Sequence, residues 1–261
     1  MEREFESDSA DGRVMFDQHV SNIELNGYDT KDPYGKKASE LAVSMLSSAM
    51  HEIVHQEVTA AIERVFPERA VHIDAFIRST TQYASKLIEA DEYTLIDIGG
   101  EYTTLNVVRG ASIEQGARVQ LGTLELLRGA SGSEAADEAA KSALIMYLSN
   151  TCTPSQCRKI ESLLKPTEKK WLSAFKDALY EAIKERSLPA VLFVSVDSRF
   201  YPWFETFLKR EEFSSYTATK RPFSPQLIRA DGSVRPVNAT GKSPDNQLML
   251  ATFFAMHSEI A

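Results

Sequence analysis

Short runs of alternating or clustered apolar and β-branched residues predict strands in the first half of the chain and again near residue 190. The first two runs cover residues 14–25 and 38–45, with turn signals at Asn26-Gly27 and Pro33 between them. Residues 93–98, 103–110 and 112–121 form three more predicted strands around tight turns. Residues 70–76 and the apolar run at 190–196 are also expected to form buried strands.

Apolar residues spaced three or four positions apart predict helices between these strands. A helix is expected over residues 51–66, a short one over 79–88, and another over 201–209. The apolar segment at residues 246–257 also predicts a helix. Because strands and helices alternate irregularly, the pattern indicates an α/β or α+β fold.

The stretch from about residue 121 to 186 is expected to be mostly helical. Ser131 and Glu134 form an S-x-x-E pattern that predicts a capping box at a helix start. Pro166 is expected to interrupt the second long helix, because proline lacks a backbone N–H and its ring clashes with the preceding turn. In that helix Trp171, Phe175 and Leu179 recur at helical spacing and are expected to face the core.

Composition narrows the class of protein. The chain has 261 residues and a formal net charge of −8, which argues against an extended nucleic-acid interface. It contains no apolar run of the roughly 18 residues that span a bilayer, and its acidic start does not resemble a secretory signal. The two cysteines, Cys152 and Cys157, are expected to be reduced, structural thiols of a cytoplasmic protein.

One short motif suggests a zinc peptidase. HEIVH, residues 51–55, matches the H-E-x-x-H pattern in which two histidines bind zinc and the glutamate activates water. The extended form of the motif needs a glycine where Val58 stands and a histidine where Ala61 stands. The residues therefore favour His51 and His55 at the edge of a packed helix face, with no zinc.

The stretch DIGG, residues 97–100, has two interpretations. Glycines let the backbone approach a phosphate closely, and a carboxylate at a strand end can hold a hydrated Mg²⁺ beside that phosphate. The alternative is an ordinary β-hairpin in which Gly99 and Gly100 serve only as the turn. The four residues alone do not separate the two interpretations.

The wider context resembles a known superfamily. DIGGEYTTLNVVRGASI, followed by QLG and a helix, is similar to the second phosphate loop of the actin-like ATPase superfamily, in particular its FtsA/PilM-like branch of cell-division and type IV pilus assembly proteins. Upstream, NIELNGYDTKDPYGKKASELAV resembles a hairpin of the small inserted SHS2 domain of that branch. Downstream, DEAAK keeps the E-x-x-K spacing of the helix that contacts the nucleoside in the family.

The resemblance implies a set of site residues and cofactors. It implies ATP and magnesium as the ligands, bound by one metal-attending carboxylate, by residues facing phosphate, and by a pair near ribose or base. By position these are Asp97 for the metal, Gly99, Gly100 and Thr103 for phosphate, and Glu138 with Lys141 for the nucleoside. For the last pair a solvated i,i+3 ion pair is an equally favoured alternative.

Three departures from the family pattern argue against efficient ATP hydrolysis. The family's first phosphate loop precedes the inserted domain, and no residues before Val14 match it, so the chain is expected to be N-terminally incomplete or to have lost that half. Glu101 and Tyr102 replace a loop glycine and threonine, and they would repel or crowd a triphosphate. In the family's adenosine motif, glycines are replaced by Ser195, Val196 and Asp197.

The resemblance thus implies an actin-like (ribonuclease H-like) α/β domain with the remnant of an SHS2-type insert. The expected divisions are residues 1–50 for the remnant, 51–92 for the rest of the first actin-like subdomain, and 93–261 for the second. The expected function is that of a degenerate cytoplasmic adaptor or scaffold in pilus assembly or cell division, with weak or lost ATP binding. It would act at the inner-membrane face through protein partners, without nucleic acid, and self-association is compatible with this role.

Two alternatives remain at this point. One is a functional Mg-ATP-dependent ATPase that is completed by an N-terminal segment, and the less favoured one is the zinc peptidase. Direct membrane attachment is not expected, because residues 246–261 contain no Lys or Arg.

Overall fold

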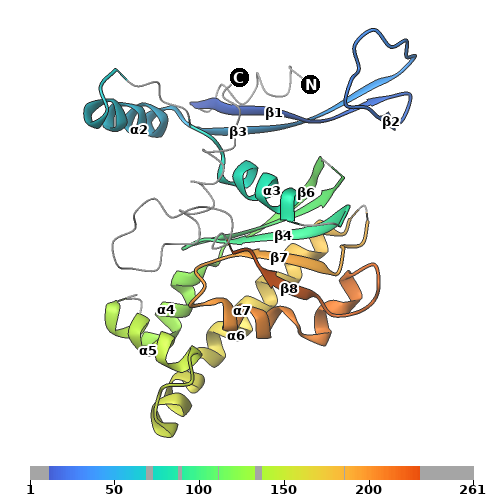
Figure 1. Cartoon of the computed structure of the whole chain (residues 1–261). Helices are drawn as coiled ribbons and strands as arrows, with labels where there is room; N and C mark the ends of the chain where they lie inside the picture. Colours follow the sequence, from blue (N-terminus) through green and yellow to red (C-terminus); the bar gives the residue numbers. More distant parts are fainter. Residues whose placement is uncertain are drawn as a thin grey trace. The chain divides into compact units, whose positions relative to one another are not determined.

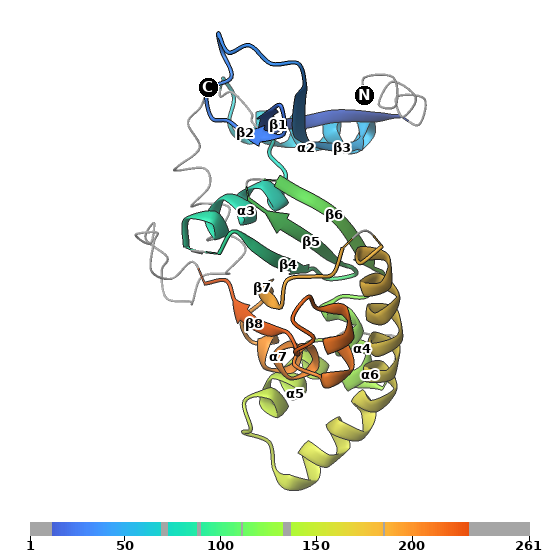
Figure 2. The same ribbon diagram turned by 90° about the vertical axis from the view of Figure 1, so that its right-hand side faces the viewer.

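The computed structural model describes residues 12–68, 73–87, 90–110, 112–132, 137–184 and 186–229. The chain forms two units, Met1–Ser79 and Thr80–Ala261 (Figures 1 and 2). In the described segments, no helix combines the length and the apolar composition that crossing a membrane requires. The predicted helix over residues 246–257 lies outside the described part of the chain.

The first unit is built on a long antiparallel ribbon. Strands β1 (Arg13–Leu25) and β3 (Leu41–His51) pair along their whole lengths, and the short β2 (Tyr28–Asp29) adds to the other edge of β1. Both residues of the Asn26-Gly27 turn have positive φ, 53° and 80°, which is the backbone that a tight hairpin requires. The Asn26 side chain also accepts hydrogen bonds from the backbone N–H groups of Ser39 and Glu40. The two predicted strands are confirmed, although β3 begins three residues later and ends six residues later than predicted.

Helix α2 (Glu52–Val65) follows β3 directly, and α3 (Phe76–Leu87) follows an irregular segment. The prediction of a strand over residues 70–76 is wrong for the described residues 73–76. Asp17, on β1, is 6% exposed, and its carboxylate accepts hydrogen bonds from the Ala75 backbone N–H at 3.1 Å and from Arg78 at 2.9 Å. These bonds hold the segment just before α3 and its first turn, so the backbone there bonds to a carboxylate rather than to a strand.

The second unit contains a five-stranded mixed sheet in the order β6-β5-β4-β7-β8. Strands β4 (Glu92–Ile98), β5 (Thr103–Arg109) and β6 (Ser112–Val119) form the antiparallel meander that the sequence predicts. Strand β7 (Val191–Ser195) pairs parallel to β4, and β8 (Ser224–Leu227) pairs parallel to β7. Because β7 is parallel to β4, the chain returns from the edge strand β6 to β7 through about seventy mostly helical residues.

That connection contains helices α4 (Thr123–Ser131), α5 (Glu138–Leu148) and α6 (Pro154–Ala182). The predicted capping box at Ser131 is wrong. Ser131 is the last residue of α4, which ends at Gly132 with φ 69°, and the N-cap of α5 is Asp137, whose carboxylate accepts from the Ala140 N–H at 2.7 Å. Glu134 lies outside the described residues. After β7, helix α7 (Tyr201–Leu208) and the 3₁₀ helix η2 (Glu211–Tyr216) precede β8.

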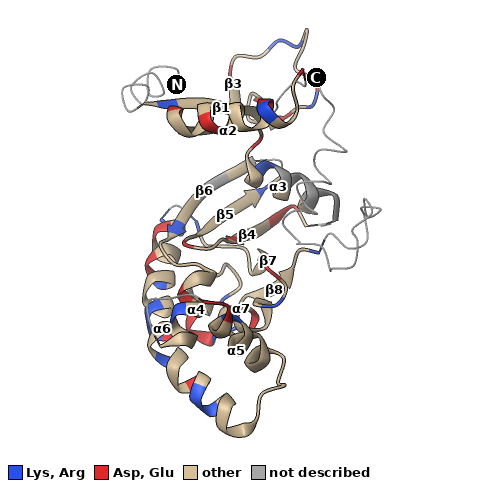
Figure 3. Cartoon of the chain, turned by 90° about the vertical axis from the view of Figure 1, so that its left-hand side faces the viewer, with Lys and Arg blue, Asp and Glu red and all other residues tan. Residues whose placement is uncertain are grey.

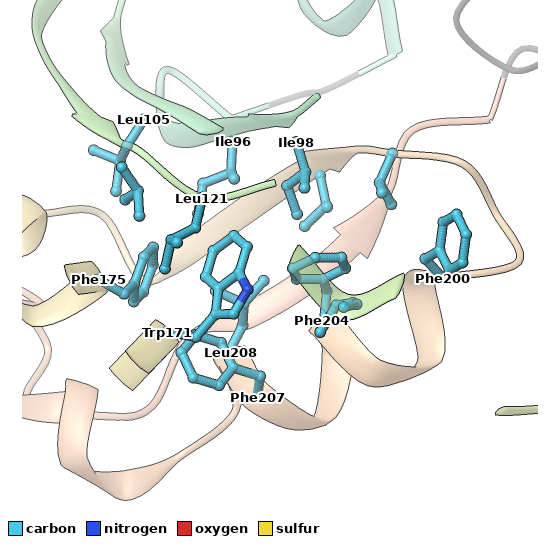
Figure 4. Packing of buried hydrophobic residues seen from close by; sticks show 14 of the residues in the cluster. Ile96, Ile98, Leu105, Leu121, Trp171, Phe175, Phe200, Phe204, Phe207 and Leu208 are labelled. Atoms are coloured by element: carbon cyan, nitrogen blue, oxygen red, sulfur yellow. The ribbon is translucent and has the colours of Figure 1, made fainter. Parts of the chain in front are cut away.

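The core lies between the sheet and helices α4, α6 and α7, which cover one of its faces (Figures 1 and 4). Trp171 is 1% exposed and meets the Phe204 ring edge-to-face at 5.3 Å between centroids. Phe175 meets the Phe213 ring in the same way at 5.1 Å. The prediction that Trp171, Phe175 and Leu179 face the core is confirmed. Edge-to-face aromatic pairs add about 0.5–1.5 kcal/mol each beyond the burial of their area.

Helix α6 runs through Pro166 without a break, so the predicted interruption is wrong. An interior proline costs a helix about 3 kcal/mol. Leu164 and Thr167, on either side of Pro166, are both buried, and Gly129 of α4 packs so closely that a Cβ there would meet the Thr167 hydroxyl at 2.3 Å. The packing of α6 on α4 therefore outweighs the lost hydrogen bond.

Cys152 and Cys157 are joined by a disulfide, which corrects the prediction of two reduced thiols. Thr153 caps α6, and its reciprocal hydrogen bonds with Gln156 form a capping box. This first turn brings the two cysteine Cα atoms to 5.6 Å, within the range that a disulfide requires. The count of two cysteines does not reveal this turn.

We expect Cys157→Ser to lower the free energy of unfolding by about 2 kcal/mol, because the disulfide closes a short loop and restricts the unfolded chain. Urea unfolding with and without dithiothreitol measures this effect. The reductant should weaken the wild-type chain to the level of the variant and leave the variant unchanged. Two thiols that react in the untreated, unfolded wild-type chain would contradict the disulfide.

Candidate functional site

The parallel strands β4 and β7 end side by side at one edge of the sheet. Asp97 on β4 pairs in register with Ser195 on β7, and β4 ends one residue later at Ile98. In open α/β sheets, ligands bind outside the carboxyl ends of the strands. The candidate site is therefore the group of side chains and turns that follow Ile98 and Ser195.

The turn after β4 is bonded to the start of α4. The carbonyl oxygens of Gly99 and Gly100 accept hydrogen bonds from the backbone N–H groups of Thr123 and Leu124, both at 2.9 Å. The N–H of Glu125 bonds to the Gly122 carbonyl at 3.1 Å. Three N–H groups that a helix N-terminus can offer to an anion are thus already bonded within the chain.

Gly122 makes this contact possible. A Cβ at residue 122 would lie 2.3 Å from the Gly100 carbonyl oxygen and 2.5 Å from that of Gly99. Across the same contact, a Cβ at Gly100 would meet only the Leu124 side chain, at an ordinary 3.5 Å. Gly122 is therefore required by close backbone approach, and Gly100 is not.

Thr103 begins β5 beside the end of β4, where it pairs with Ile98. It is fully buried, and its hydroxyl donates to the Leu121 carbonyl at 2.9 Å. This bond ties the start of β5 to the connection between β6 and α4. Among the predicted phosphate-facing residues, only Gly99 and Gly100 lie in the turn at the strand end, with Gly100 exposed.

Glu101 and Tyr102 engage neighbouring arginines. The Glu101 carboxylate binds both terminal nitrogens of Arg128 on α4, at 2.7 and 3.0 Å. Hydrogen bonding from Arg128 lowers the pKa of Glu101 below its ordinary value. The Arg118 guanidinium lies 4.8 Å from the centre of the Tyr102 ring. The sequence predicted that Glu101 would repel a triphosphate at this turn, but it did not predict Arg128 as the partner of Glu101.

Asp197 follows β7 and is held by Arg199. Its carboxylate accepts from the Arg199 backbone N–H at 3.0 Å and from the guanidinium, with Nε at 2.9 Å from Oδ1. Burial alone would raise the pKa of Asp197, but the hydrogen bonds from Arg199 and the charges of Arg199 and Lys141 outweigh it and lower that pKa. Ser195 and Val196 are fully buried, so Asp197 is the residue of this trio that reaches the edge. The signal that sequence reasoning missed is the Asp-x-Arg spacing directly after a buried strand.

Glu138 and Lys141 lie in the first turn of α5. Their side chains form an ion pair at 3.1 Å, and 83% of the Glu138 side chain is exposed. The positive charge of Lys141 also contributes to the lowered pKa of Asp197. Asp97 and Asp197 thus lie at this edge, and Thr103 is buried beside them at the start of β5.

Asp97 fits a restricted form of magnesium binding. Mg²⁺ commonly uses one or two carboxylates and completes its shell with waters and substrate phosphates. Asp97 is a half-buried carboxylate at the strand end, while the Asp197 carboxylate is occupied by Arg199. Across the described residues, no group of three or more His, Cys, Asp or Glu side chains could hold a metal ion by itself. A magnesium ion here would depend on the phosphates that accompany it.

The HEIVH segment contains the N-cap and the first residues of helix α2. His51 ends β3 and is the N-cap of α2, where its Nδ1 accepts from the Ile53 N–H at 3.4 Å. His55 lies one turn further and lines a depression of the first unit with Asp17, Asp74 and Arg78. His51 thus has a capping role, whereas helix α2 has no buried residue, so the packed helix face that the sequence predicts is not observed.

Comparison with solved structures identifies the fold. The structure described as "PilM-PilN type IV pilus biogenesis complex" is 14% identical in sequence, with a TM-score of 0.59 over 98% of this chain and 70% of that one. The chain has the actin-like fold. This confirms the fold class that the sequence predicts, whereas the SHS2 origin of the β1–β3 ribbon and the three domain divisions stay predictions.

Two further solved structures match less closely. The ethanolamine utilization protein EutJ from Carboxydothermus hydrogenoformans is 19% identical, with a TM-score of 0.37 over 56% of this chain and 48% of that one. Component A of (R)-2-hydroxyglutaryl-CoA dehydratase from Acidaminococcus fermentans is 13% identical, with a TM-score of 0.39 over 74% and 69%. No protein-family model matches the chain, and no curated protein matches it.

We expect Gly122→Ala to lower the free energy of unfolding by about 2 kcal/mol or more, because the added methyl group would clash with two main-chain oxygens. The matched control, Gly100→Ala, should change it by no more than about 0.5 kcal/mol. Urea unfolding of the two variants measures the difference. Equal stabilities would show that the turn and α4 are not in contact as described.

Proposed function

We propose that this chain is an actin-like adaptor or scaffold protein of type IV pilus assembly or cell division. It acts through protein contacts, and it binds Mg-ATP weakly or not at all. The observation that carries the proposal is the similarity to PilM, which extends over 98% of the chain. PilM was solved in a complex with PilN, so we favour pilus assembly over division and infer a partner of comparable role.

Three contacts support weak nucleotide binding. Thr123 and Leu124 at the start of α4 direct their N–H groups to Gly99 and Gly100 rather than to a ligand. The Glu101 carboxylate adds a negative charge to the turn, although Arg128 binds it. Asp197 is bound to Arg199 at the place where the family's adenosine motif has glycines. Of the proposed ATP ligands, Asp97 retains the position best suited to attend a metal.

The proposed role includes a location and an organisation. The chain would work in the cytoplasm at the inner-membrane face, held there by partners, with self-association compatible with a scaffold. The β1–β3 ribbon would be the remnant of an SHS2-type insert, within residues 1–50. Residues 51–92 would complete the first actin-like subdomain, and residues 93–261 would form the second. Glu138 and Lys141 would keep the positions that face the nucleoside in the family, although the adaptor role does not require a bound nucleotide.

We expect Mg-ATP to bind the chain with a dissociation constant above about 1 mM, corresponding to about −4 kcal/mol or weaker, and to release no phosphate. Isothermal titration and a phosphate-release assay measure these two properties. Asp97→Ala should weaken any residual binding, and Asp177→Ala, an exposed carboxylate on α6, is the matched control. Micromolar binding that is lost only in Asp97→Ala would contradict this part of the proposal and favour a functional ATPase.

The pilus role predicts partners. A tagged chain that is purified from its source organism after mild crosslinking should recover inner-membrane proteins of the pilus assembly complex, because an adaptor acts by contact. Mass spectrometry identifies them against an untagged control. Recovery of division proteins alone would indicate a role in cell division instead. Recovery of neither group would refute the adaptor role.

A further inference from the structure

A cavity of about 360 Å³ lies in the second unit, between the end of α5, the first half of α6, and α7. Its walls include Tyr147, Glu161, Glu168, Trp203, Phe207 and Arg210. Tyr147 follows Glu138 by nine residues on α5, so the cavity lies roughly 13 Å along that helix from the edge of β4 and β7. Its volume lies within the range of small-ligand sites.

Aromatic rings form one wall. Trp203 and Phe207 stack with ring centroids 5.2 Å apart and planes 8° from parallel, and Trp203 is partly exposed. Tyr147 contributes its ring from α5. Faces of aromatic rings attract cations, most strongly those of tryptophan.

The same wall already holds one guanidinium. Arg210 lies 5.3 Å from the centre of the Phe207 ring and is ion-paired with Glu168. Its other terminal nitrogen approaches Glu212 at 3.6 Å. A carboxylate from α6 and an aromatic face from α7 therefore flank an arginine side chain here, with Glu212 as a further neighbour.

Glu161 is a second carboxylate of α6 in the cavity wall. It precedes Glu168 by seven residues on α6, so both carboxylates lie on the same side of the helix. Charges of both signs occur along α6 (Figure 3), yet within the described part of the chain no hydrogen bond or ion pair engages Glu161. Burial, and then the charge of Glu161, raise the pKa of the Tyr147 phenol. The negative charge of Glu161 therefore influences another residue of the cavity lining.

We propose that this cavity binds an arginine side chain of a partner protein, with the guanidinium against Glu161 and stacked on the Trp203 wall. The chemistry is that of the internal Glu168–Arg210–Phe207 group, and the net charge of −8 favours a basic partner. A guanidinium suits the site better than an ammonium, because it combines a planar stacking face with paired donors for a carboxylate. This site is independent of the nucleotide edge and of the pilus assignment.

The test uses the full chain and the blocked tripeptide acetyl-Gly-Arg-Gly-amide. The chain has two tryptophans, of which Trp171 is buried and Trp203 lines the cavity. In an NMR titration of the ¹⁵N-labelled chain, the Trp203 indole signal should shift and saturate with a dissociation constant of roughly 1–10 mM, as expected for a single side chain. The citrulline tripeptide has the same shape without the charge, and its dissociation constant should be at least about ten times larger.

Glu161→Gln should weaken binding of the arginine peptide by about tenfold, because it removes one charge-assisted contact. Glu205→Gln on α7 is the matched control, since that carboxylate pairs with Lys209 outside the cavity walls named above. Glu161 is exposed, so the variant should fold, and circular dichroism checks this. Equal binding of the two peptides, no saturable shift, or unchanged binding in Glu161→Gln would each overturn the proposal.

Discussion

Two main-chain hydrogen bonds, from Thr123 and Leu124 to the carbonyls of Gly99 and Gly100, join the central strand β4 to the helical half of the second unit. They form because Gly122 has no side chain between the two segments. The turn after β4 therefore cannot move independently of α4. The same bonds occupy the N–H groups of a helix start, so one local contact both stabilises the fold and reduces what the turn can offer to a phosphate.

The sequence predicted the strands around this turn because their residues are β-branched and clustered, as in residues 93–98 and 103–110. It did not predict the hydrogen-bond partners of the side chains around the turn. Thr103 has a hydroxyl next to a glycine turn, which is what a phosphate loop needs, but its bond to Leu121 depends on where β6 ends. In the same way, the pairing of Glu101 with Arg128 joins residues 27 positions apart. Such contacts are set by tertiary structure rather than by local pattern.

Local rules also failed where packing or covalent bonding decided the outcome. Pro166 should end a helix, yet the burial of Leu164 and Trp171 on either side keeps α6 continuous. Cys152 and Cys157 were predicted to be reduced thiols because the chain has only two cysteines and was expected to be cytoplasmic. The capped first turn of α6 instead places them at bonding distance. In the first unit, the buried Asp17 carboxylate binds the backbone N–H of Ala75, in a segment whose residues predicted a strand.

The proline in α6 has a mechanical consequence. Pro166 cannot donate to the Ser162 carbonyl, so the helix ladder lacks one rung there and α6 bends most easily at that point. The C-terminal segment is fixed by Trp171 and Phe175, while the N-terminal segment carries Glu161 and is anchored through Ile160 and Leu164. A bend there would change the spacing between Glu161 and Glu168, which lie on opposite sides of Pro166 and both line the cavity beside Trp203.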